Sequence, residues 1–174
     1  LYELKADMAA YLATRGPSVP HRTLADLIRF NEQNKEKEMP FFGQEIFIQA
    51  EAKGPLSSPE YKKALATCIR LTRTQGMDRV LPARRLDALL APTGGPAWMT
   101  DLVNGDHSGG GSSMLSAVSG YPAITVPAGQ VMGLPVGLSF MGPAWSEGPL
   151  IGMAYAFEQT IKARQAPRFL DSIT

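Results

Sequence analysis

Cysteine and histidine are scarce in this 174-residue sequence, which has one cysteine and two histidines. A single cysteine, Cys68, cannot form an internal disulfide and cannot build a cysteine-based zinc site. It lies in an apolar helical series with Leu65 and Leu71, which predicts a buried structural thiol rather than a nucleophile. The histidines, His21 and His107, are far apart and form no HExxH-type pair. The case for a metal site is therefore weak, and nothing in the sequence implies a metal or an organic cofactor.

Long apolar runs and an excess of charge of either sign are also missing. No apolar run approaches the length of about 18 residues that suggests a membrane span. Lys and Arg total 17, Asp and Glu total 16, and no basic tract stands out. This balance argues against nucleic acid or an anionic membrane surface as a partner. No secretory leader is visible, so we expect a cytoplasmic protein; a signal preceding Leu1 would instead direct it to the periplasm or outside the cell.

Residues 1–85 show a mainly helical pattern of apolar residues. Thr23 and Asp26 resemble a capping pair at a helix start, and Ser58 resembles the N-cap of a long helix for which Gly76 is the expected stop. The predicted helices have apolar residues at helical spacing and Gly or Pro at their ends. One ends before Gly16, one begins after Thr23, and two cover 44–53 and 59–75.

Residues 86–174 change to short apolar runs bounded by Gly or Pro, at 87–92, 123–127 and 135–141. Such runs predict strands in a sheet that is covered on both faces. Helices are expected over 112–119 and 147–164, and a loosely held end from Pro167. Strands that alternate with helices indicate an α/β fold.

The apolar run 87–92 has no polar face, so we expect a strand inside the sheet with neighbours on both sides. We expect it to end beside the strand 123–127, so that both carboxyl ends face one cleft.

The polar segment after Thr93 contains the candidate site residues. Its run from Gly109 to Ser113 could present N–H groups to an anion, or form a flexible turn in which a serine caps the next helix. Trp98 and Trp145 each follow a Gly/Pro turn and could form the wall of a ligand site or plug the sheet edge.

A Ser-His-Asp triad could be assembled in this segment from Ser112 or Ser113, His107, and Asp101 or Asp106. All of these residues, however, lie in one short loop, whereas triad members usually come from separate elements braced by a core. The sequence therefore argues against a self-contained triad.

Several ordered motifs resemble the second half of the amidase signature family, and the resemblance covers nearly the whole chain. They are Glu3-Leu-Lys5 with Tyr11-Leu12, Leu86-Asp-Ala-Leu-Leu-Ala-Pro-Thr93, Gly120-Tyr-Pro-Ala-Ile-Thr-Val-Pro127, Gly133-Leu-Pro-Val-Gly137, Phe140-Met-Gly142, and a closing helix with Glu147, Leu150, Ala154, Tyr155, Phe157 and Glu158. The segments Gly-Gly-Pro-Ala-Trp98 and Asn104-Gly-Asp106 are most similar to the peptide amidase branch.

The resemblance implies a mixed sheet flanked by helices on both faces, and hydrolysis of a carboxamide to an acid and ammonia. The family uses a lysine, a serine after a cis peptide bond and a nucleophilic serine, all in its earlier half. No residue of this chain matches them, so no catalytic residue is assigned. The chain, residues 1–174, is expected to be the C-terminal part of an amidase domain.

The resemblance further implies that the segment after the first strand lines the substrate cleft, with Thr93, Trp98, Asp101, His107 and Ser112 as substrate-binding residues. The expected partners are a small-molecule or peptide amide substrate and the N-terminal half of the same enzyme. The sequence does not decide whether the protein forms a homo-oligomer. Two alternatives remain: a non-catalytic amidotransferase or assembly module, and a free-standing small-molecule binding domain.

Overall fold

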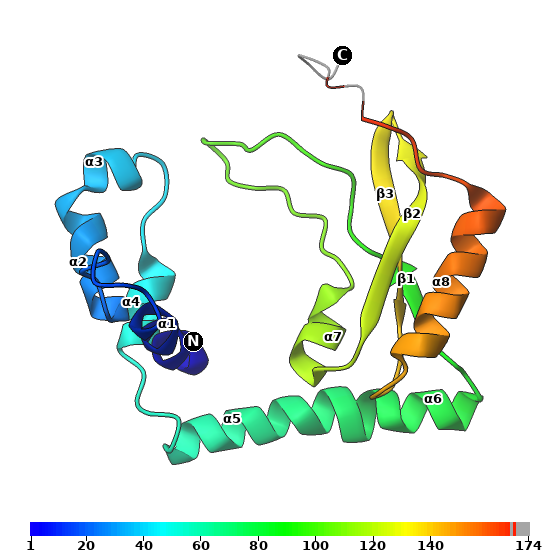
Figure 1. Ribbon diagram of the computed structural model, residues 1–174, viewed down its shortest axis with the longest axis horizontal. Helices are drawn as coiled ribbons and strands as arrows, with labels where there is room; N and C mark the ends of the chain where they lie inside the picture. Colours follow the sequence, from blue (N-terminus) through cyan, green and yellow to red (C-terminus); the bar gives the residue numbers. More distant parts are fainter. Residues whose placement is uncertain (168, 170–174) are drawn as a thin grey trace. The chain divides into compact units, whose positions relative to one another are not determined.

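The computed structural model describes residues 1–167 and 169, and the chain forms two compact units (Figure 1). The first unit comprises Leu1–Thr67 and the second Cys68–Thr174. The loosely held end predicted from Pro167 lies, apart from Pro167 and Phe169, outside the described residues.

The first unit is built from helices. They are α1 (Tyr2–Ala13), α2 (Leu24–Gln33), α3 (Lys35–Glu38), α4 (Glu45–Glu51) and most of α5 (Pro59–Ile69). The predicted capping pair is present, because the Thr23 side chain accepts from the Asp26 N–H and the Asp26 carboxylate accepts from the Thr23 N–H. This pair satisfies N–H groups that a helix start leaves free. The Asp26 carboxylate also accepts from the Arg22 N–H, and this bond above all, together with those from the Thr23 hydroxyl and N–H, lowers the pKa of Asp26 to about 2.

A small apolar core holds the helices of the first unit together. Leu12 of α1, Leu24 of α2 and Ala50 of α4 are buried. The ammonium group of Lys5 donates to the Glu51 carbonyl oxygen at 2.8 Å and pairs with its carboxylate at 3.0 Å. Helix α1 is therefore joined to the end of α4 by both apolar and charged contacts.

The long helix breaks at Gly76, as predicted, but a second helix follows it without a loop. Helix α5 passes into a π-helical segment, η1 (Arg70–Met77), and then into α6 (Asp78–Arg84). Gly76 has φ −97° and ψ −112°, and a Cβ atom there would lie 2.5 Å from the carbonyl oxygen of Leu71. The glycine therefore permits the sharp break between the long helix and the helix that follows it.

Cys68 is exposed, which corrects the prediction of a buried thiol. Cys68 lies in the regular helix α5, which has no buried residue, so its apolar spacing is not matched by packing among the described residues. In this part of the chain, Met77 and Leu81 are the buried residues instead, whereas Leu65 and Leu71 are exposed.

A three-stranded sheet lies at the centre of the second unit. Its strands are β1 (Leu89–Pro92), β2 (Ala123–Val131) and β3 (Leu134–Met141), in the order β1-β3-β2, and both ladders are antiparallel. The prediction that the first strand has neighbours on both sides was wrong for the described residues, because β1 is an edge strand. Leu89 and Ala91 pack on the cluster of Met77, Leu81 and Met141, whereas Leu90 is 55% exposed, so the apolar side chains of β1 are covered on one face only among the described residues.

Helices cover both faces of this sheet, which confirms the α/β fold class (Figure 1). Helix α8 (Glu147–Ile161) packs on one face, where Leu150 and Ala154 contact Val126 and Phe140. On the other face, Met77 and Leu81 contact Met141, and Leu115 of α7 (Ser113–Ser119) joins them. Phe140 and Met141 are successive residues of β3, so their side chains point to opposite faces.

The contact of α8 with the sheet predicts a large difference between two neighbouring aliphatic positions. Leu150 is 1% exposed and Ile151 is 58% exposed. Leu150→Ala should lower the free energy of unfolding by about 2–5 kcal/mol because it leaves a cavity. Ile151→Ala is the matched control and should change it by about 0.5 kcal/mol or less. Urea denaturation of the natural protein measures both; equal losses would contradict the packing of α8.

Candidate functional site

Thr93 and Pro127 lie at the same level of the sheet, as predicted, although β2 continues beyond Pro127 to Val131. The Thr93 N–H, directly after β1, donates to the Gly137 carbonyl oxygen at 2.8 Å. Pro127 of β2 lies opposite the same Gly137 in the register of β2 and β3. Since Gly137 lies between them, the carboxyl end of β1 is brought next to the middle of β2.

Three hydroxyl groups meet on the sheet at this point. The Thr93 hydroxyl is hydrogen-bonded to the hydroxyls of Thr125 and of Ser139, the latter at 2.8 Å. A Cβ atom on Gly137 would lie 2.8 Å from the Thr93 hydroxyl and 2.9 Å from that of Thr125. The cluster of Thr93, Thr125 and Ser139, called the hydroxyl cluster below, therefore requires glycine at position 137.

Asp101 organises the loop that leaves β1. Its carboxylate accepts hydrogen bonds from the N–H groups of Val103 and Asn104, each at 2.9 Å, and from the Asn104 side chain at 2.9 Å. These bonds, those from Asn104 above all, lower the pKa of Asp101. The carboxylate therefore stays ionised and fixes the backbone of its own loop.

Trp98 and His107 lie in the same loop and are largely accessible. The Trp98 indole N–H donates to the Asp106 carboxylate at 3.4 Å, and the tryptophan is 47% exposed. His107 lies 3.8 Å from the Asp101 carboxylate. Trp145 is 91% exposed, so neither tryptophan is buried as a plug at the sheet edge.

Ser112 lies where the loop returns to the sheet and α7 begins. Its N–H donates to the Thr93 carbonyl oxygen at 3.2 Å, and Gly94 and Gly111 form an isolated antiparallel bridge. Thr93 and Ser112 are thus brought together by backbone contacts. Asp101, Trp98 and His107 lie within the loop instead.

The Ser112 hydroxyl is buried and has no hydrogen-bond partner among the described residues, and the same is true of Ser116. It neither caps α7 nor meets a base there. A serine hydroxyl is a poor nucleophile until a base takes its proton. The geometry therefore gives no support to a local triad of Asp101, His107 and Ser112.

An apolar pocket of about 580 Å³ opens beside Ser112. It lies between η1 and α7 and is lined by Cys68, Leu71, Thr72, Gly111, Ser112, Met114, Leu115, Val118 and Met141. The buried hydroxyl of Ser112 adds a polar group to these otherwise mainly apolar walls. Together with the hydroxyl cluster and the loop after β1, this pocket forms the candidate site.

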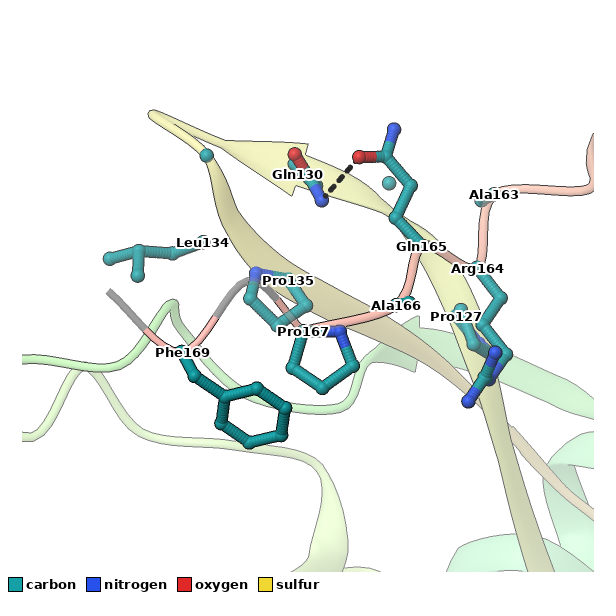
Figure 2. A pocket seen from close by; sticks show the side chains of 12 residues that line it. Pro127, Gln130, Leu134, Pro135, Ala163, Arg164, Gln165, Ala166, Pro167 and Phe169 are labelled. Carbon is teal, nitrogen blue, oxygen red and sulfur yellow. Dashed lines mark hydrogen bonds between the residues drawn. The ribbon is translucent and has the colours of Figure 1, made fainter.

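A second pocket, of about 390 Å³, lies between the β2–β3 hairpin and the segment after α8 (Figure 2). The Gln130 side chain donates to the Gln165 side-chain oxygen at 3.1 Å, which fastens that segment to the hairpin. Among the described residues that line this pocket, Arg164 is the only ionisable one, and none is a serine or histidine. It therefore offers less chemistry than the pocket beside Ser112.

Within the described ranges, no group of His, Cys, Asp and Glu side chains is arranged to hold a metal ion. Among the helices of the same residues, none is long and apolar enough to cross a membrane.

Comparison with known proteins identifies the family. The Amidase family profile matches residues 2–151. This chain belongs to the amidase family. The resemblance inferred from the sequence motifs is thereby confirmed.

Relatives of this amidase-family chain differ in how much of it they match. A probable amidase from Arabidopsis thaliana is 37% identical over 172 residues, 98% of this chain and 30% of the relative. The structure of native peptide amidase from Stenotrophomonas maltophilia matches with 47% identity and a TM-score of 0.87, over 98% of this chain and 34% of that one. A glutamyl-tRNA(Gln) amidotransferase subunit from Desulforudis audaxviator is 51% identical over 51 residues, 29% of this chain and 10% of the relative. The chain thus spans about a third of the length of the two relatives that it matches almost throughout.

Sequence reasoning missed three residues of this region: Thr125, Ser139 and Arg73. Thr125 and Ser139 alternate with apolar residues in their strands, a pattern that could have indicated a polar patch on one face. Their meeting with Thr93 depends on the register of three strands. Arg73, whose contact with α7 is described below, had no sequence signal, because its partner lies more than forty positions away.

The hydroxyl cluster predicts that Gly137 cannot be replaced without cost. Gly137→Ala should lower the free energy of unfolding by about 1–3 kcal/mol, because its methyl group forces the Thr93 and Thr125 hydroxyls apart. The matched control is Gly152→Ala in α8, where a Cβ atom meets nothing within 4 Å. That variant should be neutral or more stable by up to about 1 kcal/mol. Thermal and urea unfolding measure both, and an unaffected Gly137→Ala would contradict the cluster.

Proposed function

We propose that this chain is the substrate-lining part of an amidohydrolase that cleaves a carboxamide to an acid and ammonia. The observation that carries the proposal is the likeness to a peptide amidase over nearly the whole chain. The catalytic lysine and two serines would be supplied by residues outside this sequence, in an N-terminal part of the same enzyme. The chain would complete the sheet and form one wall of the substrate cleft.

The residues at the carboxyl end of β1 suit a role in binding rather than in bond cleavage. Acyl transfer needs a nucleophile with a base beside it and preorganised donors for the oxyanion. The Ser112 hydroxyl has no base at hydrogen-bond distance among the described residues. Thr93, Asp101, His107 and Ser112 would instead hold the polar atoms of the amide substrate, and Trp98 would offer it an apolar face.

A second candidate is an amidotransferase module that works only with a partner protein. The match to one amidotransferase subunit, which is 51% identical over 51 residues, favours it. That match covers less than a third of the chain, whereas the peptide amidase matches almost all of it. A free-standing binding domain is disfavoured, because Phe41, Phe42, Ile46 and Ile48 of the first unit are exposed.

The test is ammonia release from a peptide amide, with two proteins. The natural full-length protein should hydrolyse the substrate without an added partner, and the 174-residue chain alone should release no ammonia above the uncatalysed rate. Activity of the chain alone that disappears in Ser112→Ala or Ser113→Ala would contradict the proposal and favour a local triad. Activity that appears only with a partner protein would favour the amidotransferase module.

The same assay tests the role of Trp98 with a matched tryptophan control. In the full-length protein, Trp98→Ala should lower kcat/KM about tenfold to a hundredfold, mainly through KM, because it removes an apolar contact with the substrate. Trp145→Ala should leave kcat/KM unchanged. A lower melting temperature with normal kinetics in Trp98→Ala would show a structural role instead.

A further inference from the structure

Helix α7 connects the candidate site to a buried contact at its opposite end. The helix has seven residues, Ser113–Ser119, and is about 10 Å long at 1.5 Å per residue. A helix this short is marginal on its own in water, so tertiary contacts must hold it in place. Its position decides where Gly111 and Ser112 lie relative to Thr93.

The carboxyl end of α7 is held by Arg73 of the π-helical segment η1. The Arg73 Nε donates to the Ser119 carbonyl oxygen at 2.6 Å, and Ser119 is fully buried. A cation at this end of a helix is favourable, because the last carbonyl groups are unpaired and carry partial negative charge. The positive charge of Arg73 therefore stabilises the carboxyl end of α7.

Neighbouring side chains fix the Arg73 guanidinium group. Its carbon lies 5.1 Å from the centre of the Tyr121 ring, a cation–π distance. The Tyr121 hydroxyl in turn donates to the Asp78 carboxylate at 2.7 Å. Gly120 has φ +70°, and a Cβ atom there would lie 3.2 Å from an Arg73 nitrogen. Arg73, Ser119, Tyr121 and Asp78 form a connected set, called the Arg73 anchor below.

The backbone between Arg73 and Asp78 lets both residues contact Tyr121. This segment contains the kink at Gly76, after which Met77 is buried beside the sheet and Asp78 reaches Tyr121. The unusual backbone thus brings Arg73 and Asp78 to the same end of α7.

On the basis of the function proposed above, we propose that Arg73 is a positioning residue for substrate binding. It acts through α7: by holding the Ser119 carbonyl it keeps the other end of the helix, with Gly111 and Ser112, against Thr93 and beside the apolar pocket. Arg73 itself does not line that pocket. Loss of the Arg73 anchor leaves the buried Ser119 carbonyl without its cationic partner and lets α7 shift.

The test compares three variants of the natural full-length protein: Arg73→Met, Arg73→Lys and Arg70→Met. Arg70 is the matched control, because it is exposed on the same π-helix and its side chain bonds only that of Gln75 among the described residues. One readout is hydrogen exchange of the amides of 112–119, with 147–161 of α8 as an internal reference. The second readout is kcat and KM for a peptide amide, measured below the unfolding temperature.

We expect Arg73→Met to raise exchange in 112–119 at least about tenfold, leave 147–161 unchanged, and lower kcat/KM by up to roughly a hundredfold, as a misplacement of about 1 Å can do. Arg73→Lys should show smaller changes in both readouts. A lysine ammonium group can reach the Ser119 carbonyl oxygen, but it cannot at the same time lie over the Tyr121 ring as a planar guanidinium group does. Arg70→Met should behave like the parent. If Arg73→Met does not fold, Arg73→Lys serves for the same comparison.

Unchanged exchange in 112–119 would overturn the anchor, and faster exchange with unchanged kcat/KM would overturn its role in substrate binding. If the parent hydrolyses no amide, the proposed function fails. The exchange data then still decide whether Arg73 holds α7.

Discussion

The pairing of β3 with its hairpin partner β2 on one side and with β1, which is distant in sequence, on the other is the constraint on which the second unit depends. On one side of β3, the Gly137 carbonyl oxygen accepts a hydrogen bond from the Thr93 N–H. On the other side, Gly137 lies opposite Pro127 of β2. This register brings three hydroxyls together and sets the point at which the loop after β1 leaves the sheet. Because α7 begins where that loop returns to Thr93, the pocket beside Ser112 also depends on this pairing.

The helices on the two faces of this sheet have different consequences. Helix α8 supplies apolar contacts through Leu150 and Ala154, and these contribute stability. The opposite face carries η1, α6 and α7, and there a buried apolar cluster lies next to hydroxyls, those of Ser112 and Ser116, that have no partner among the described residues. Buried hydroxyls without a hydrogen bond cost free energy, which is a reason to look for function on this face.

Local sequence signals predicted the elements well where the chemistry is local. The capping box of Thr23 and Asp26 and the Pro or Gly residues around the three apolar runs each satisfy a local backbone requirement. The common level of Thr93 and Pro127 followed from the expected strand ends together with the usual arrangement of α/β sheets, whereas the continuation of β2 to Val131 was not predicted.

The errors arose where neighbours distant in sequence decide the outcome. Cys68 is exposed although it lies in an apolar helical series, because burial depends on what packs against a helix, and α5 has no buried residue. The edge position of β1 does not follow from its side chains, because they report on the faces of a sheet and not on its edges. For the site, Thr93 and Ser112 could be predicted together, whereas Ser139, Thr125 and Arg73 required the tertiary structure.

The segment from Thr93 to Ser112 is proposed above to line the substrate site of an amidase. The most direct measurement is a crystal structure of the natural full-length protein with a slowly hydrolysed peptide amide bound. The account predicts polar atoms of the ligand within about 3 Å of donors or acceptors in 93–112. A ligand bound at the catalytic groups without any contact to this segment would contradict it.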